Sequence, residues 1–278
     1  VKFLELPCEM YMRVALFLAD TKEQYDLYYD RLINKKISLA TPVLLNAGTT
    51  SANMISCSLN TLKDDSLEGI NKTMAEINKM SSDSAGIGLH VTNLRSKDSG
   101  FGNKGKAGGL IRYLQIVNAN LRFFKQQENR RGSAAVYLDA WHRDIIDFLN
   151  IRKQEIKEEY AARDLFPALV VPDLFYKRLA ENGTWSLFCP NDVLKIKGYD
   201  LINCWGEEFE KRYIACENDM TVPRITMTAS DLMTEIVKAQ SETGTPYILN
   251  KDNANRSYNQ ENYGVCKTSN LCIEVLNY

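Results

Sequence analysis

The fold class is first indicated by the segment Phe166-Pro167-Ala168-Leu169-Val170-Val171. It is an apolar run that stops at Pro172, and a short apolar run closed by a turn residue predicts a buried strand. Upstream of it, residues 133–141 favour a strand and residues 144–151 favour a helix. Strands that alternate with helices in this way indicate an α/β architecture.

The alternation continues toward the C-terminus. Residues 230 to about 240 favour a helix that stops near Gly244. Pro246-Tyr247-Ile248-Leu249 then favours a short strand. The α/β pattern therefore extends well beyond the central run.

The N-terminal part is predicted to be helical at first. Residues 11 to about 33 favour two helices, the second capped by Thr21. Residues 38–45 contain Pro42 and are predicted to be extended, as a strand start or an edge strand. Further on, Asp65 with a glutamate three positions later predicts a capping box at a helix start.

Composition excludes several classes of protein. The 278 residues include 34 basic and 35 acidic side chains, so a nucleic-acid partner is not expected. No apolar run of 18 residues is present, so no membrane span is expected either, and the first residues do not resemble a signal peptide. Seven irregularly spaced cysteines without a Cys-x-x-Cys pair favour a reducing, cytoplasmic setting. With only two histidines, we expect no metal site in this chain.

The sharpest local pattern is Ser269-Asn270-Leu271-Cys272-Ile273-Glu274-Val275, in which polar and apolar residues alternate. We expect this segment to be extended, which places Asn270, Cys272 and Glu274 on one face. A thiol can react, a carboxylate can move a proton and an amide can orient a hydroxyl group. The alternative interpretation is an amphipathic strand whose polar side faces solvent.

Four other segments have both a structural and a functional interpretation. Cys57, in Ser56-Cys57-Ser58, is either a small buried cysteine or a redox thiol. Residues 100–105 read Gly-x-Gly-x-x-Gly, but no strand leads directly into them, so a glycine-rich loop is favoured over a dinucleotide site. Residues 125–132 are either a charged helix end or a loop offering Arg130 to a nucleotide. The helix start at Asp65 is a plain cap or a ligand site, at which Asp65 accepts a hydrogen bond from a ribose and Arg95 meets a phosphate.

Together, the motifs along the chain resemble the large catalytic subunit of class I ribonucleotide reductase. The resemblance runs nearly from end to end and is carried by residues 40–48, 56–57, 63–70, 85–88, 137–142, 163–166, 205–210, 242–247 and 269–274. It implies half of a ten-stranded α/β barrel preceded by a short helical segment. We expect residues 1–37 to be that segment and residues 38–278 to be the first half-barrel, ending at the start of the central finger loop.

The resemblance also implies roles for individual residues. Cys272 would become a thiyl radical that takes the 3′ hydrogen of a ribonucleotide, Glu274 would remove the 3′-hydroxyl proton, and Asn270 would hold that hydroxyl. Cys57 would be one of the two cysteines that supply the electrons. Two further sets are implied. The substrate-binding set is Thr41, Ser56, Gly86, Asn270 and Glu274, and the set that binds the allosteric effector is Asp65, Ser66, Leu67, Arg95 and Arg130.

The implied activity is that of a ribonucleoside-diphosphate reductase that depends on thioredoxin or glutaredoxin. The implied partners are a C-terminal half of the large subunit, a second large subunit, a metal-containing small subunit that supplies the radical, and ATP or deoxynucleotide effectors. No cofactor is expected in this chain, and we expect a fragment that is inactive alone. The alternative hypotheses are an idle nucleotide-binding module that keeps only the effector site, and a nicotinamide-dependent dehydrogenase that rests on the glycine motif.

Overall fold

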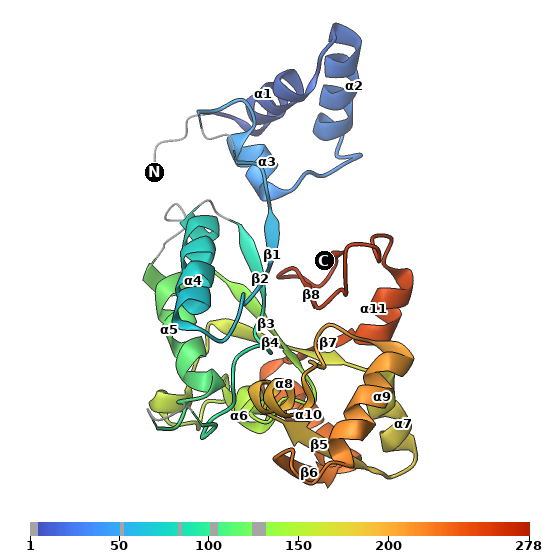
Figure 1. Cartoon of the computed structure of the whole chain (residues 1–278). Helices are drawn as coiled ribbons and strands as arrows, with labels where there is room; N and C mark the ends of the chain where they lie inside the picture. Colours follow the sequence, from blue (N-terminus) through green and yellow to red (C-terminus); the bar gives the residue numbers. More distant parts are fainter. Residues whose placement is uncertain (1–4, 51–52, 83–84, 101–104, 124–131) are drawn as a thin grey trace.

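The computed structural model describes residues 5–50, 53–82, 85–100, 105–123 and 132–278 (Figure 1). In these ranges the helices are α1 (Pro7–Leu18), α2 (Lys22–Ile33), α3 (Thr41–Asn46), α4 (Leu67–Ser82), α5 (Leu110–Phe123), α6 (Ile145–Asn150), the 3-10 turn η2 (Glu158–Tyr160), α7 (Asp173–Ala180), α8 (Pro190–Lys197), α9 (Gly206–Glu217), α10 (Ala229–Thr243) and α11 (Lys251–Ser257). The strands are β1 (Cys57–Thr61), β2 (Gly86–His90), β3 (Ala134–Asp139), β4 (Leu165–Val171), β5 (Thr184–Phe188), β6 (Arg224–Thr228), β7 (Tyr247–Asn250), β8 (Thr268–Ser269) and β9 (Leu276–Asn277).

A five-stranded parallel sheet forms the centre of the fold, in the order β1-β2-β3-β4-β7. The segments between successive strands contain helices, as parallel strands require a crossover. β5 and β6 form a separate antiparallel pair between β4 and β7 in the chain. The α/β fold predicted from the sequence is confirmed, and β4 coincides with the apolar run at residues 166–171.

The two faces of this sheet have different partners, because successive side chains of a strand point to opposite sides. In β3, Val136 and Leu138 belong to the large core formed with the helices. Ala135 and Tyr137 belong to a second, smaller core that includes Leu249 and Cys266. We call this second side the inner face.

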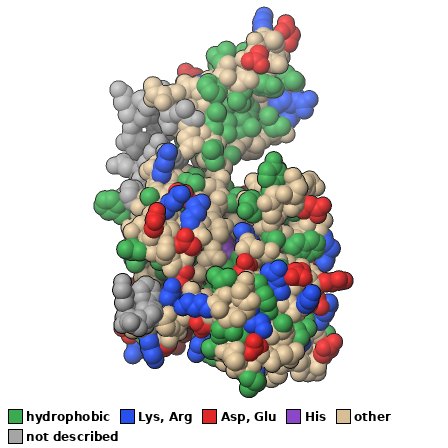
Figure 2. Space-filling model, in the orientation of Figure 1, with side chains coloured by type: hydrophobic (Ala, Val, Ile, Leu, Met, Phe, Trp, Pro, Cys, Tyr) green, Lys and Arg blue, Asp and Glu red, His purple; other side chains and the backbone are tan. Residues whose placement is uncertain are grey.

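The N-terminal helices form a small unit of their own. Their core contains Val14, Ala15, Leu32 and Ala47, and the side chain of Thr21 accepts a hydrogen bond from the Gln24 amide, which confirms it as the cap of α2. Apolar side chains are also exposed on α1 and α2, and they gather at this end of the molecule in Figure 2. A unit of three short helices has too little interior to bury all of them.

The prediction that residues 38–45 are extended is wrong, because α3 spans Thr41–Asn46. Pro42 lies in the first turn of this helix, where its fixed φ angle fits and its missing N–H costs no hydrogen bond. Proline is equally compatible with an extended segment, so this residue did not decide between the two.

The start of α4 also differs from the prediction. Ser66, rather than Asp65, directly precedes the helix, and its hydroxyl accepts a hydrogen bond from the Gly69 amide at 2.9 Å. The carboxylate of Asp65 instead forms an ion pair with Arg95. Ser and Asp are both good caps, and the ion pair to a residue 30 positions away selects between them.

At the other end of the chain, the predicted helix stop at Gly244 is confirmed. This glycine follows α10 with a φ angle of 73°, the left-handed conformation that favours glycine. No helix in the described ranges is both long and apolar enough to cross a membrane.

Candidate functional site

A hairpin at residues 268–277 carries the candidate catalytic residues. β8 and β9 are its antiparallel strands, and Ser269 pairs with Leu276. The residues between them form a turn, in which Ile273 has a φ angle of 61°. The prediction that this segment is extended throughout is therefore wrong.

The side chain of Asn270 explains why the chain turns here. Its Oδ1 accepts hydrogen bonds from the amides of Glu274 and Val275, both at 3.1 Å. An asparagine that accepts bonds from nearby backbone amides offers the chain an alternative to a sheet ladder. Because Asn270 is fully buried, its side chain is held in place as the acceptor of both amides.

The turn nevertheless brings together the residues that the sequence grouped on one face. Asn270 Nδ2 donates a hydrogen bond of 2.6 Å to Glu274 Oε1. The sulfurs of Cys57 and Cys272 and a carboxylate oxygen of Glu274 all lie within 4.8 Å of one another. Cys272 and Glu274 are exposed, whereas Cys57, the first residue of β1, is half-buried. Two thiols and a carboxylate thus meet at one point at the amino end of β1.

Two glycines of β2 make room for this hairpin on the inner face of the sheet. A Cβ atom at Gly86 would lie 2.9 Å from the side chain of Leu271 and 3.2 Å from the sulfur of Cys57. A Cβ atom at Gly88 would lie 1.8 Å from the carbonyl oxygen of Ser269. A glycine inside a strand often marks such a close approach of another backbone.

Tyr137 of β3 holds the hairpin on the inner face of the sheet. Its hydroxyl donates a buried hydrogen bond of 2.7 Å to the carbonyl oxygen of Asn270. Burial raises the pKa of the Tyr137 hydroxyl, so it keeps its proton and remains a donor. The sequence does not single out Tyr137 as a site residue, because an inward-facing tyrosine in a strand has the pattern of an ordinary core residue.

A cluster of three polar side chains also lies on the inner face, at the carboxyl ends of the strands. Lys251 Nζ is 3.0 Å from Asp139 Oδ1, and Asp139 Oδ2 is 2.9 Å from His90 Nε2. All three residues are buried. The Lys251 ammonium also donates to the carbonyl oxygens of Leu201 and Ile202, at 3.3 and 3.0 Å. These contacts tie β2, β3 and the start of α11 to the loop before α9.

Electrostatics within this group follow from burial and pairing. Burial disfavours the charged form of Asp139, but the Lys251 ammonium and the bond from His90 outweigh it and lower the carboxyl pKa. Burial also lowers the pKa of His90, despite the favourable effect of Asp139. We conclude that the group is a carboxylate and an ammonium ion with a neutral imidazole.

The residues expected to bind an effector are only partly brought together. Asp65 and Arg95 form an ion pair that is mostly shielded from solvent, and Arg95 Nη1 also donates to the carbonyl oxygen of Gly100 at 3.1 Å. Ser66 caps α4, and the side chain of Leu67 is 77% exposed. Arg130 lies outside the described residues.

The remaining substrate-binding residues lie in different surroundings. Thr41 is exposed at the first position of α3, in the helical unit. The carbonyl oxygen of Ser56 accepts a hydrogen bond of 2.8 Å from the Gly86 amide, so this pair belongs to the floor of the site. Their roles toward a substrate stay predictions.

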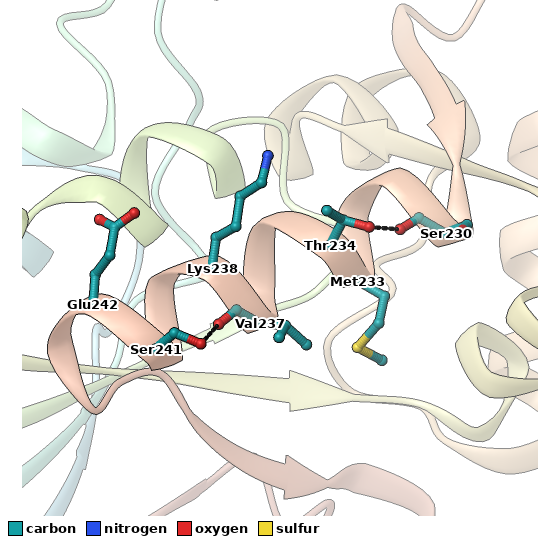
Figure 3. Close-up of a pocket in the computed structure, with 7 residues that line it drawn as sticks. All are labelled: Ser230, Met233, Thr234, Val237, Lys238, Ser241 and Glu242. Atoms are coloured by element: carbon teal, nitrogen blue, oxygen red, sulfur yellow. Dashed lines mark hydrogen bonds between the residues drawn. The ribbon is translucent and has the colours of Figure 1, made fainter.

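A surface groove on α10 is unrelated to this site. It is lined by Ser230, Met233, Thr234, Val237, Lys238, Ser241 and Glu242 (Figure 3). The hydroxyls of Thr234 and Ser241 donate to carbonyl oxygens of their own helix, each at 2.9 Å. Both hydroxyl protons are therefore donated within α10 and not to a ligand.

Two protein-family models together match nearly the whole chain. The family model "Ribonucleotide reductase, barrel domain" matches residues 55–278, and "Ribonucleotide reductase, all-alpha domain" matches residues 2–52.

Individual relatives agree with these family models. The chain is 42% identical to the ribonucleoside-diphosphate reductase large subunit of Arabidopsis thaliana, over 99% of the chain and 33% of that protein. It is 43% identical to the large subunit of Danio rerio, over the whole chain and 34% of that protein, and 40% identical to that of Variola virus, over the whole chain and 36% of that protein. The chain thus spans about a third of the length of the curated relatives it matches. On this basis the chain belongs to the ribonucleotide reductase family.

Proposed function

We propose that this chain supplies the first half of the catalytic barrel of a ribonucleoside-diphosphate reductase large subunit. The observation that carries the proposal is the convergence of Cys57, Cys272 and Glu274, whose sulfur and oxygen atoms lie within 4.8 Å of one another. Reduction of a ribose needs a hydrogen-abstracting group, a base and a source of two electrons. Cys272 would supply the hydrogen-abstracting group and Glu274 the base. Cys57 would be one of the two cysteines that supply the electrons.

The proposed reaction assigns one step to each side chain. Cys272, oxidised by one electron to a thiyl radical, takes the 3′ hydrogen atom of the ribonucleotide. Glu274 removes the proton of the 3′-hydroxyl, and the 2′-hydroxyl takes a proton from the thiol pair of Cys57 and a second cysteine outside this chain and leaves as water. This pair then gives its second proton and two electrons and becomes a disulfide, so that C2′ gains a hydrogen. Glu274 returns its proton to the 3′-oxygen, and Cys272 returns the hydrogen atom to C3′. The thiyl radical is thereby regenerated, and the deoxyribonucleotide leaves.

The surroundings of the site suit this division of labour. The hydrogen bond from Asn270 orients the Glu274 carboxylate, which a general base requires. The same amide group is the proposed holder of the 3′-hydroxyl, since Nδ2 has a second proton beside the one that it donates to Glu274. Ser56, Gly86 and Thr41 are the proposed contacts of the rest of the substrate.

We further propose that the helix start at α4 is the effector site. A deoxynucleotide triphosphate would bind across Asp65, Ser66, Leu67 and Arg95, with Arg130 relaying the identity of the base. The Asp65–Arg95 ion pair gives this proposal a consequence, because a ligand that uses either side chain must share or replace that pair. Asp65→Ala is expected to weaken deoxynucleotide binding at least tenfold, measured by calorimetry, while Cys272→Ser leaves the binding unchanged.

The proposed activity needs further components. These are the C-terminal half of the large subunit, a metal-containing small subunit that generates the radical, a second large subunit, and thioredoxin or glutaredoxin in the cytoplasm. The small subunit is the source of the one-electron oxidation of Cys272. ATP and deoxynucleotides are the proposed effectors.

The test is to combine the chain with a C-terminal half and a small subunit from a relative, supply a dithiol, and measure deoxynucleotide formation. Cys272→Ser is expected to lower the rate to background, and Cys8→Ser, in the distant helix α1, is expected to keep it. Full activity of Cys272→Ser would refute the mechanism. Effector binding that persists in an assembly without any turnover would favour the idle regulatory module instead.

A further inference from the structure

The atoms that meet at the hairpin also suit a metal ion. Two sulfurs and a carboxylate oxygen lie within 4.8 Å of one another, and they come from two separate segments of the chain. Within the described ranges, this is the one group of three or more His, Cys, Asp or Glu side chains close enough to share an ion. We infer that Cys57, Cys272 and Glu274 form a binding site for a thiolate-binding divalent cation, Zn²⁺, at which the fourth position is open to water.

The donor set selects the kind of cation. Thiolates favour Zn²⁺ over the hard cations Mg²⁺ and Ca²⁺, which prefer sets of oxygen ligands. Zinc sites with three protein ligands keep a fourth position for water or another small ligand. Two sulfurs and one carboxylate therefore fit an open zinc site.

The distances can reach bonding geometry with small movements. Bonds of about 2.3 Å from zinc to sulfur place two tetrahedral sulfurs about 3.8 Å apart. The present limit of 4.8 Å is about one ångström longer. Cys272 is exposed in the turn and Cys57 is half-buried at a strand start, so rotation of their side chains can close that difference.

The groups around the site support the ligands. Asn270 Nδ2 holds Glu274 Oε1 at 2.6 Å, and a hydrogen bond of this kind orients a ligating carboxylate. Tyr137 in turn holds the backbone of Asn270. The absence of a Cβ atom at Gly86 leaves space beside the Cys57 sulfur. This inference differs from the expectation of no metal site, which rests on the small number of histidines and does not consider two cysteines that meet in the fold.

Zinc bound here would have one direct effect on the proposed reaction. It would engage the Cys272 sulfur and the Glu274 carboxylate together, so neither could act on a ribose. Metal binding is thus expected to inhibit turnover reversibly, with activity restored by a chelator. The inference itself does not rest on that reaction, since ligation requires only the three donors.

The test uses the chain as it stands, kept reduced, with Co²⁺ as a spectroscopic probe and Zn²⁺ as a competitor. One equivalent of Co²⁺ is expected to produce thiolate-to-cobalt charge-transfer absorption, and Zn²⁺ is expected to abolish it. Cys57→Ser and Cys272→Ser should each weaken binding at least a hundredfold, and Glu274→Gln at least tenfold. Cys8→Ser is the matched control and should bind as the wild type does.

Two results would overturn the inference. One is the lack of any thiolate-to-cobalt absorption in the folded wild-type chain. The other is the same absorption in Cys272→Ser and in wild type, which would place the metal on other cysteines. Binding should also weaken as the pH is lowered, because thiols release protons when they bind zinc. None of these readouts needs the small subunit. A failure of the reductase assay therefore leaves the metal-binding test unaffected. A failure of the metal-binding test likewise leaves the reductase proposal unaffected.

Discussion

A Cβ atom at Gly88 would lie 1.8 Å from the carbonyl oxygen of Ser269, so the backbone of the hairpin rests directly on β2. Gly86, two residues earlier on the same face, leaves room for Leu271 and for the sulfur of Cys57. The positions of Cys272 and Glu274 therefore depend on the absence of side chains at Gly86 and Gly88.

Gly88→Ala is expected to displace the hairpin. The added methyl group meets backbone rather than a flexible side chain, and overpacking of this kind costs about 1–3 kcal/mol of unfolding free energy. Gly100→Ala is the matched control, because a Cβ atom there would meet nothing within 4 Å. Urea unfolding of both variants tests the prediction, and equal stabilities would contradict it.

Asn270→Ala is expected to loosen the turn. The substitution removes the acceptor of two amides and the donor to Glu274, and each such hydrogen bond contributes about 0.5–1.5 kcal/mol to stability. Hydrogen exchange at the amides of Glu274 and Val275 should accelerate. Asn270→Asp keeps an acceptor for both amides, so it should preserve more of their protection. Unchanged exchange in the alanine variant would show that the turn does not depend on this side chain.

Lys251→Met is expected to be among the most destabilising single changes. It leaves the buried carboxylate of Asp139 without its cation, and breaking a buried pair on one side costs about 3–5 kcal/mol. The double variant Lys251→Met, Asp139→Leu should recover part of this loss, because neither charge is then buried. Chemical denaturation of both variants tests this, and a cost below about 1 kcal/mol for Lys251→Met would contradict it.

Acidification is expected to destabilise the fold through its two histidines. Burial lowers the pKa of both His90 and His142, and His142 Nδ1 accepts a hydrogen bond from the Asp144 amide, which requires a neutral ring. Below the ordinary histidine pKa of about 6.5, the unfolded chain binds protons that the folded chain does not. Stability should therefore fall as the pH drops through this value, by up to about 1.4 kcal/mol per pH unit for each histidine.

His90→Gln should remove about half of that pH dependence. The measurement is urea unfolding between about pH 7.5 and pH 5.5, above the range in which ordinary carboxyl groups titrate. The lowered pKa of Asp139 adds stability that is lost only in stronger acid. A wild-type stability that rises on acidification would contradict the account.

Local sequence signals predicted the elements that local forces determine. The apolar run at β4 is buried on both faces, Thr21 caps α2, and Gly244 ends α10, and each of these depends on residues close in the chain. Pro42 is compatible with a strand start and with a helix start, and Asp65 with a cap and with an ion pair. In both cases the choice depended on contacts that local patterns do not contain.

The site shows a different limit of sequence reasoning. Alternation placed Asn270, Cys272 and Glu274 together through an extended backbone, and the structure brings them together through a turn held by Asn270. The Lys251–Asp139 pair joins residues 112 positions apart, which no local pattern reveals. The two glycines of β2 were the usable signal that was missed, because an interior Gly-x-Gly in a strand indicates that another backbone lies against that face.

A single turnover of the prereduced assembly without any external dithiol tests whether Cys272 and Cys57 act in one reaction. About one deoxynucleotide per active site is expected, and mass spectrometry should show that Cys57 has changed from a thiol to a disulfide. In Cys272→Ser, no product and an unchanged Cys57 thiol are expected. Product formation by Cys272→Ser at the wild-type amount, or wild-type turnover that leaves Cys57 reduced, would contradict the proposed reaction.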